Sequence, residues 1–261
     1  KVALVPFHMW SPDVYQGSPT TVTGFLCTAP KAAGFGALII LFNRAFVEIH
    51  YQWQDIFWFL SALTMTVGNV SALIQHNVKR MLAFSSVSHA GFLIMGILVL
   101  NETSISAVLF YLVVYSIVNL GAFAIVSAAE QEEKGLNLKD YRGLAAQHPW
   151  LSAAMTIFML SLAGFPPTAG FVAKYGIFSA AIEQGYIWLV IIGVLNTLIS
   201  VYYYLRLVVN MYMQKEADPL QPAYGIVALG LLSLLVVVVL VFGISPDFLL
   251  EITANATKVG Y

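Results

Sequence analysis

Charged residues are scarce in this sequence. Of its 261 residues, 12 are Lys or Arg and 13 are Asp or Glu, and the formal net charge is −1. An ordinary soluble domain carries roughly 25% charged residues, whereas this chain carries 10% and is 59% hydrophobic. The composition predicts an integral membrane protein. Because no basic cluster exceeds an adjacent pair, binding to nucleic acid is not predicted.

Cysteine is nearly absent, and the sequence contains no glycine-rich nucleotide-binding loop. The single thiol, Cys27, excludes a disulfide framework and a Cys-ligated cluster within this chain. Only His89 lies deep in an apolar run, whereas a bis-histidine haem needs a matched pair on facing helices. We therefore expect no cofactor in this chain and any redox centres in other subunits.

The sequence also lacks an initiating Met and a cleavable signal peptide. Its first apolar run stops before Pro12, far short of the ~20 residues that span a bilayer. We expect the chain to begin inside a helix whose preceding part lies outside this sequence.

Long apolar runs predict an all-α polytopic membrane protein, with the end of one broken helix near Gly17 and about seven transmembrane helices after it. The seven runs are residues 19–43, 55–74, 81–100, 104–129, 150–184, 187–213 and 223–244. The fifth run is too long for one crossing and contains Gly164, Pro166, Pro167 and Gly170. Because proline cannot donate a helical hydrogen bond, a second broken helix is predicted near 164–170.

The cations outside these runs divide unequally between the two sides of the membrane. One side receives six cations and the other two: Lys79, Arg80, Lys134, Lys139, Arg142 and Lys215 against Arg44 and Lys258. The positive-inside rule makes the first side cytoplasmic, which places the C-terminus outside. Arg206 lies near the cytoplasmic end of its helix, so we expect it to anchor there by reaching the interface.

Three lysines do not fit this sorting. Lys31 and Lys174 lie within long apolar runs, and Lys1 opens the apolar segment VALVPF. A cation at the bilayer centre costs about 2.5–3.5 kcal/mol on insertion scales, so such residues usually face a protein interior or a water path. A buried lysine can also load and release a proton. Lys31 and Lys174 are therefore predicted to carry protons.

Polar side chains recur at helical spacing on three further runs. The three sets are Ser85 and His89; Tyr111, Tyr115 and Asn119; and Asn196, Ser200 and Tyr203. Lipid cannot satisfy these groups, so the faces are predicted to turn toward one another around a hydrated axis. The alternative is ordinary hydrogen bonding between packed helices. For His89, a structural hydrogen bond and a proton relay both remain open.

Four segments carry a family resemblance. They read KVALVPFHMWSPDVYQGSPTTVTGFL, PKAAGFG, VKRMLAFSSVSHAGF and LSLAGFPPTAGFVAKYGIF. Together they resemble the antiporter-like membrane subunits of respiratory complex I, in the subunit N branch that includes mitochondrial subunit 2 and its plastid counterpart. Bacterial members have fourteen helices in two inverted five-helix repeats, each with one broken helix. The resemblance implies that this chain is the C-terminal half.

On that basis the chain divides into three segments. Residues 1–54 would end the first repeat, 55–213 would form the second repeat, and 214–261 would form a C-terminal transmembrane helix and tail.

The resemblance also implies roles for individual residues. Lys1 corresponds to the proton-loading lysine of the first half-channel, whose glutamate partner lies on a helix absent from this sequence. Lys31 in PKAAGFG corresponds to the connecting lysine, and Lys174 in GFVAKYG to the terminal lysine of the second half-channel. Many members of the branch have glutamine where His89 stands. His89 thus adds a relay step or replaces the hydrogen bond of the amide.

The function implied is that of a proton-translocating subunit of NADH:quinone oxidoreductase without a redox centre of its own. NADH, FMN, iron–sulfur clusters and quinone would bind to other subunits, and the partners would be other membrane-arm subunits and lipid. The implied location is the bacterial inner membrane, with the thylakoid and mitochondrial inner membranes as alternatives. Two rivals stay open: a subunit of a multisubunit Na⁺/H⁺ antiporter or membrane-bound hydrogenase, and a structural subunit that moves no ions.

Overall fold

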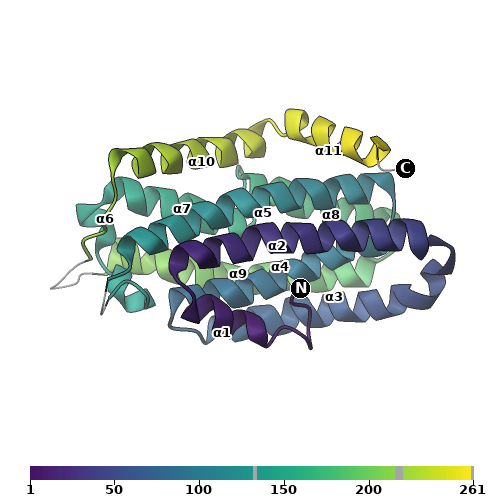
Figure 1. Cartoon of the computed structure of the whole chain (residues 1–261), viewed down its shortest axis with the longest axis horizontal. Coiled ribbons are helices and arrows are strands. Elements are labelled where there is room, and N and C mark those ends of the chain that lie inside the picture. Colours follow the sequence, from purple (N-terminus) through teal and green to yellow (C-terminus); the bar gives the residue numbers. More distant parts are fainter. Residues whose placement is uncertain (132–133, 215–219, 260–261) are drawn as a thin grey trace.

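The long helices lie side by side along one axis and form a bundle (Figure 1). The computed structural model describes residues 1–131, 134–214 and 220–259, and within these ranges every regular element is a helix. Lys215, one of the predicted cytoplasmic cations, lies outside the described residues. The predicted all-α class is confirmed.

Eleven α-helices make up the described part of the chain. They are α1 (Trp10–Gly17), α2 (Thr20–Ile40), α3 (His50–Leu73), α4 (Val78–Val99), α5 (Glu102–Ala129), α6 (Leu144–Gln147), α7 (Pro149–Ala163), α8 (Ala169–Glu183), α9 (Ile187–Met213), α10 (Ile226–Ile244) and α11 (Asp247–Val259). Short helices of other types cover Leu41–Ala45, Val47–Ile49 and Leu138–Tyr141.

Six helical segments among the described residues are long and apolar enough to cross a membrane. They are Thr20–Ala45, Val47–Leu73, Val78–Val99, Glu102–Ala129, Ile187–Met213 and Ile226–Ile244. These correspond to six of the seven predicted spans.

The remaining predicted span, the fifth run at residues 150–184, is interrupted as expected. Helix α7 ends at Ala163 and α8 begins at Ala169. Gly164 takes the left-handed conformation that ends α7, with φ +85°, and the two prolines that follow cannot continue the helix. The prediction of a broken helix near 164–170 is confirmed.

Helix α4 lies at the centre of the bundle, and the apolar window that would cross the membrane is buried along its whole length. Helices α3 and α4 approach each other closely where they cross, because the residues at the contact are glycines, which have no side chain. A Cβ on Gly68 would lie 2.5 Å from the backbone nitrogen of Ser88, and one on Gly91 would lie 2.7 Å from that of Met65. Small residues of this kind let helix backbones approach each other in membranes.

The sequence places Lys79 in a connection between two spans. In the structure it lies in the first turn of α4, and its side chain is only 2% exposed. It donates to the carbonyl of Ser18 at 2.7 Å and lies 3.8 Å from the carboxylate of Glu130. Lys79 thus ties α4 to the α1–α2 connection and to the end of α5.

Arg206 lies at the same end of the bundle as Lys79. Its guanidinium donates to the carbonyl of Leu73 at 3.1 Å and to the carbonyl of Gln75. These carbonyls are left without helical partners where α3 ends. Arg206 therefore has a specific hydrogen-bonding role in closing α3, beyond a general anchoring role at the interface.

The segment after residue 244, the predicted tail, contains the helix α11. This helix packs on the first turns of α5, where the hydroxyls of Thr253 and Ser106 are 2.9 Å apart. Its 13 residues mix apolar side chains with Asp247, Glu251 and Lys258. They therefore form no apolar run of spanning length.

Candidate functional site

Lys31 lies in the middle of α2 and is 2% exposed. Its Nζ donates to both the backbone carbonyl and the hydroxyl of Ser86 on α4, and it lies 5.4 Å from the ring centroid of Tyr115 on α5. The Tyr115 hydroxyl in turn lies 3.1 Å from the sulfur of Cys27, one turn before Lys31. The lysine is therefore enclosed by polar groups from three helices.

The helix around Lys31 is locally modified by Pro30. Because proline has no amide hydrogen, it leaves the carbonyl four residues earlier without its usual partner. That carbonyl belongs to Leu26, and it accepts a hydrogen bond of 3.2 Å from the Tyr15 hydroxyl of α1. Helix α1 thus completes the hydrogen bonding of α2 just before the buried lysine.

Lys174 lies in the second turn of α8, beside the break, and is 4% exposed. Its Nζ donates to the carbonyl of Ala163 at 3.1 Å, one of the groups left unpaired where α7 ends. The ammonium also lies 5.0 Å from the ring centroid of Phe92 on α4. The break therefore supplies the acceptor that holds Lys174 inside the bundle.

His89 connects three helices between the two lysines. Its Nδ1 lies 2.6 Å from the hydroxyl of Tyr111 on α5, and its Nε2 lies 3.1 Å from the hydroxyl of Tyr204 on α9. The Tyr204 hydroxyl also contacts the hydroxyl of Ser85. A neutral imidazole donates through one nitrogen and accepts through the other, and hydroxyls rotate to suit. The result is a hydrogen-bonded chain from Ser85 to Tyr111.

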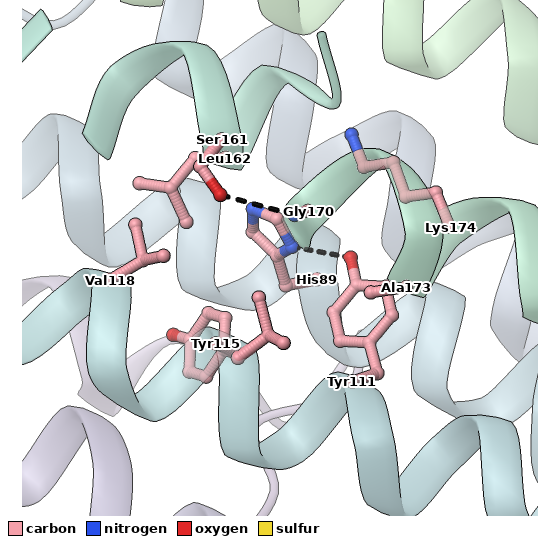
Figure 2. A pocket seen from close by; sticks show the side chains of 10 residues that line it. His89, Tyr111, Tyr115, Val118, Ser161, Leu162, Gly170, Ala173 and Lys174 are labelled. Carbon is pink, nitrogen blue, oxygen red and sulfur yellow. Dashed lines mark hydrogen bonds between the residues drawn. The ribbon is translucent and has the colours of Figure 1, made fainter. Parts of the chain in front are cut away.

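A small cavity separates this chain from Lys174. Figure 2 shows His89, Tyr111 and Lys174 around it, with Ser161 and Gly170 from the two sides of the break. Its volume is about 10 Å³, close to the minimum of about 10–15 Å³ that one water needs. The cavity lies between the His89–Tyr111 pair and the Lys174 side chain and has room for about one water.

Neither Lys31 nor Lys174 has a carboxylate partner within ion-pair distance among the described residues. The ion pairs found there, Lys79–Glu130 and Arg80–Asp13, lie at one end of the bundle. Carbonyl and hydroxyl oxygens and aromatic rings therefore surround the two buried amines.

The predicted polar faces do meet, although some of the partners differ from those expected. Asn196 and Tyr203 of α9 both bond to Asn69 of α3, which the sequence analysis does not single out. Ser200 bonds to a carbonyl of its own helix, and so does Asn119. These two bonds join no helix to another, whereas the bonds of Asn69 to α9 match the alternative of ordinary hydrogen bonding between packed helices.

Tyr204 is the most important residue that the sequence analysis misses. The predicted stripe on α9 continues from Ser200 to Tyr203. A strict spacing of four residues from Asn196 leads instead to Tyr204, the residue that contacts His89. This spacing of four residues is the signal by which the sequence could have identified Tyr204.

Lys1 is exposed and lies against α2. A Cβ on Gly34 would be 3.7 Å from Cβ of Lys1 and 2.8 Å from Cγ1 of Val2, so the first residues pack one turn beyond Lys31. No acidic partner of Lys1 occurs among the described residues. Its role as a proton-loading site stays a prediction, as does the division into segments 1–54, 55–213 and 214–261.

Comparisons with known proteins identify relatives of this chain. Residues 1–200 match the family model for the NADH:quinone oxidoreductase/Mrp antiporter transmembrane region. A protein of Trichlorobacter lovleyi named NADH-quinone oxidoreductase subunit N is 47% identical over 99% of this chain and 54% of its own length. The chain therefore spans about half the length of the curated relatives it matches.

Solved structures show the same fold. A chain of respiratory complex I from Thermus thermophilus with bound aureothin is 35% identical, with a TM-score of 0.83 over 96% of this chain and 55% of that one. A chain of the Mrp complex from Dietzia is 22% identical with a TM-score of 0.89, over 100% of this chain and 57% of that one, and at this identity it supports the fold alone. The family match and the six helical segments of spanning length together show that this is an integral membrane protein. The chain belongs to the NADH:quinone oxidoreductase/Mrp antiporter transmembrane family.

Proposed function

We propose that this chain is part of a proton-translocating membrane subunit of NADH:quinone oxidoreductase. The observation that carries the proposal is the pair of buried lysines, Lys31 and Lys174, with hydrogen-bonding groups around His89 between them and no ion-pair partner among the described carboxylates. The relatives named as subunit N support complex I over an antiporter of the Mrp type.

The path we propose runs through protein groups and water. A proton held on Lys31 passes to Ser86, water carries it to Ser85, and it continues through Tyr204, His89 and Tyr111, from which the cavity water carries it to Lys174. Hydroxyls and imidazole both donate and accept, so each can pass a proton on. Loading and release would follow changes in the electrostatic field along the membrane arm. Lys1 would be the residue at which the first half-channel takes up its proton.

The chain supplies no electron carrier in this proposal. NADH oxidation, flavin and iron–sulfur chemistry and quinone reduction take place in other subunits, and the chain contacts other membrane-arm subunits and lipid. We place it in the bacterial inner membrane, with the connections that carry Lys139 and Arg142 in the cytoplasm and the C-terminus outside.

The test is Lys31→Ala in the full-length subunit within the assembled complex. We expect proton pumping per NADH, measured in inverted membrane vesicles, to fall roughly 3- to 10-fold. This is less than the 10²–10⁴-fold that a positioned proton-transfer group contributes, because water can enter the space left beside Ser86. The matched control is Lys139→Ala, since Lys139 is exposed in a connection.

Unchanged pumping by Lys31→Ala at normal assembly would contradict the proposal. A protonophore and a sodium ionophore applied separately to the wild type distinguish the ion. Collapse of the gradient by the protonophore alone is the expected result, and collapse by the sodium ionophore alone would favour the antiporter alternative.

A second prediction tests the continuity of the path. Tyr204→Phe keeps the ring but removes the hydroxyl that contacts His89 and Ser85. A hydrogen bond contributes about 0.5–1.5 kcal/mol, so we expect coupled pumping to fall about 2- to 10-fold. Tyr202→Phe on the same helix is the control, because Tyr202 is 62% exposed and turned away from the path. Equal behaviour of the two variants would remove Tyr204 from the path.

A further inference from the structure

The C-terminal segment contains another interrupted helix. Helix α10 ends at Ile244 and α11 begins at Asp247, with Ser245 and Pro246 between them. In Figure 1, α11 follows α10 along the bundle and reaches the end of the bundle where the C-terminus is marked. Pro246 cannot donate to the last turn of α10, which accounts for the interruption.

This interruption lies directly against the broken helix that carries Lys174. A Cβ on Gly243, one residue before the end of α10, would lie 2.0 Å from the carbonyl oxygen of Pro167 and 2.5 Å from the carbonyl carbon of Thr168. Real Cβ atoms essentially never approach backbone atoms below 3.0 Å. The two backbones therefore touch at the point where each helix is interrupted, and only glycine allows the contact.

The α7–α8 break has close backbone packing on its other sides as well. The backbone nitrogen of Gly170 donates to the Ser161 hydroxyl at 3.1 Å, and the carbonyl of Ala163 holds Lys174. A Cβ on Gly164 would come within 3.0 Å of the Lys174 side chain. A shift of the 167–168 backbone therefore moves the first turns of α8 and changes the position of Lys174.

Helix α11 extends this arrangement to the end of the bundle. Beyond the interruption, Thr253 bonds to Ser106 near the start of α5, and Leu249 and Thr257 are buried. Packed helices transmit displacement along their length because a close-packed interface does not deform continuously. Ser245 and Pro246, which we call the α10–α11 link, are thus coupled by packing to the break beside Lys174 and, through α11, to the start of α5.

We propose that Gly243 is a positioning residue for Lys174, and that the α10–α11 link and the α7–α8 break move as one unit. This inference rests on the proposed proton-carrying role of Lys174. It assigns to the C-terminal helices the function of setting the distance between the Lys174 amine, the Ala163 carbonyl and the cavity beside His89.

The test compares Gly243→Ala with Gly230→Ala in the assembled complex. Both lie on α10, but a Cβ on Gly230 meets nothing within 4 Å. We expect Gly243→Ala to lower coupled proton pumping by roughly 2- to 30-fold, the range for residues that modulate coupling between sites, and Gly230→Ala to leave it unchanged. On a Lys174→Gln background, Gly243→Ala should add no further loss.

Wild-type pumping by Gly243→Ala, or a full additional loss on the Lys174→Gln background, would overturn the positioning role. Normal pumping by Lys174→Gln alone would instead refute the proposed function, so the two failures are distinguishable.

A second measurement does not require Gly243→Ala to assemble. Hydrogen–deuterium exchange in the full-length complex compares the wild type with Lys174→Gln. We expect changed exchange at residues 164–171 and also at 244–250, with residues 226–235 unchanged. A change confined to the α7–α8 break would overturn the proposal.

Discussion

Replacing Lys174 with alanine is expected to reduce proton pumping per NADH by about tenfold or more, the largest functional effect in this chain. A positioned proton-transfer group contributes about 10²–10⁴-fold in rate. Among the described residues that line the cavity at the break, Lys174 and His89 are the only ones of the Lys, Arg, His, Asp and Glu types. Without the amine, a proton at Tyr111 has no titratable acceptor across the cavity among the described lining residues. The measurement is proton pumping by inverted vesicles that contain the full-length subunit in the assembled complex.

Two further variants separate charge from packing at this site. Lys174→Gln keeps most of the side-chain volume and should lose nearly as much pumping as alanine, because the titratable amine is gone. Lys258→Ala removes an exposed lysine near the end of α11 and should pump normally. Wild-type pumping by Lys174→Gln would show that the residue has a packing role only.

Replacing Gly91 with valine is expected to prevent stable assembly of the subunit. A Cβ at this position would lie 2.7 Å from the backbone nitrogen of Met65 and 3.0 Å from the carbonyl of Ser61, so α3 and α4 would have to separate. Overpacking in a well-packed interior costs typically about 1–3 kcal/mol, and a contact with backbone leaves no side chain to move aside. The 2.8 Å hydrogen bond from the Ser61 hydroxyl to the Gly91 carbonyl would also be lost.

The measurement is the amount of subunit in the intact complex on a native gel, with membrane insertion checked separately. Gly36→Val is the control, because a Cβ on Gly36 in α2 meets nothing within 4 Å. Wild-type amounts of complex carrying Gly91→Val would mean that the α3–α4 crossing tolerates separation.

The spans and their breaks could be predicted from the sequence because both depend on local chemistry. A helix that crosses a bilayer needs about 20 apolar residues, and a pair of prolines after a glycine interrupts it wherever it lies. Lys31 and Lys174 could be identified for the same reason, since the cost of a cation inside an apolar run does not depend on the fold.

Other features depend on which faces meet, and the sequence does not contain that information locally. Asn69 has a polar neighbour at helical spacing, Thr66, but only the fold shows that both contact Asn196 of α9. Lys79 resembles any loop cation until the fold places Glu130 and the Ser18 carbonyl beside it. Tyr203 and Tyr204 are adjacent in sequence, and although spacing places Tyr204 on the Asn196 face, only the fold shows that Tyr204 contacts His89 and Tyr203 contacts Asn69.

The complete burial of α4 has a consequence for the biogenesis of the protein. Ser85, Ser86 and His89 enter the membrane during synthesis long before Tyr204, since the His89–Tyr204 contact joins residues 115 positions apart. Until α9 is made, the imidazole lacks one of its partners. Contacts of such long range form late, so the proposed proton path should close only when α9 has been inserted. A ribosome stalled before α9 would therefore leave His89 and Ser85 of α4 without the Tyr204 hydroxyl in the nascent chain.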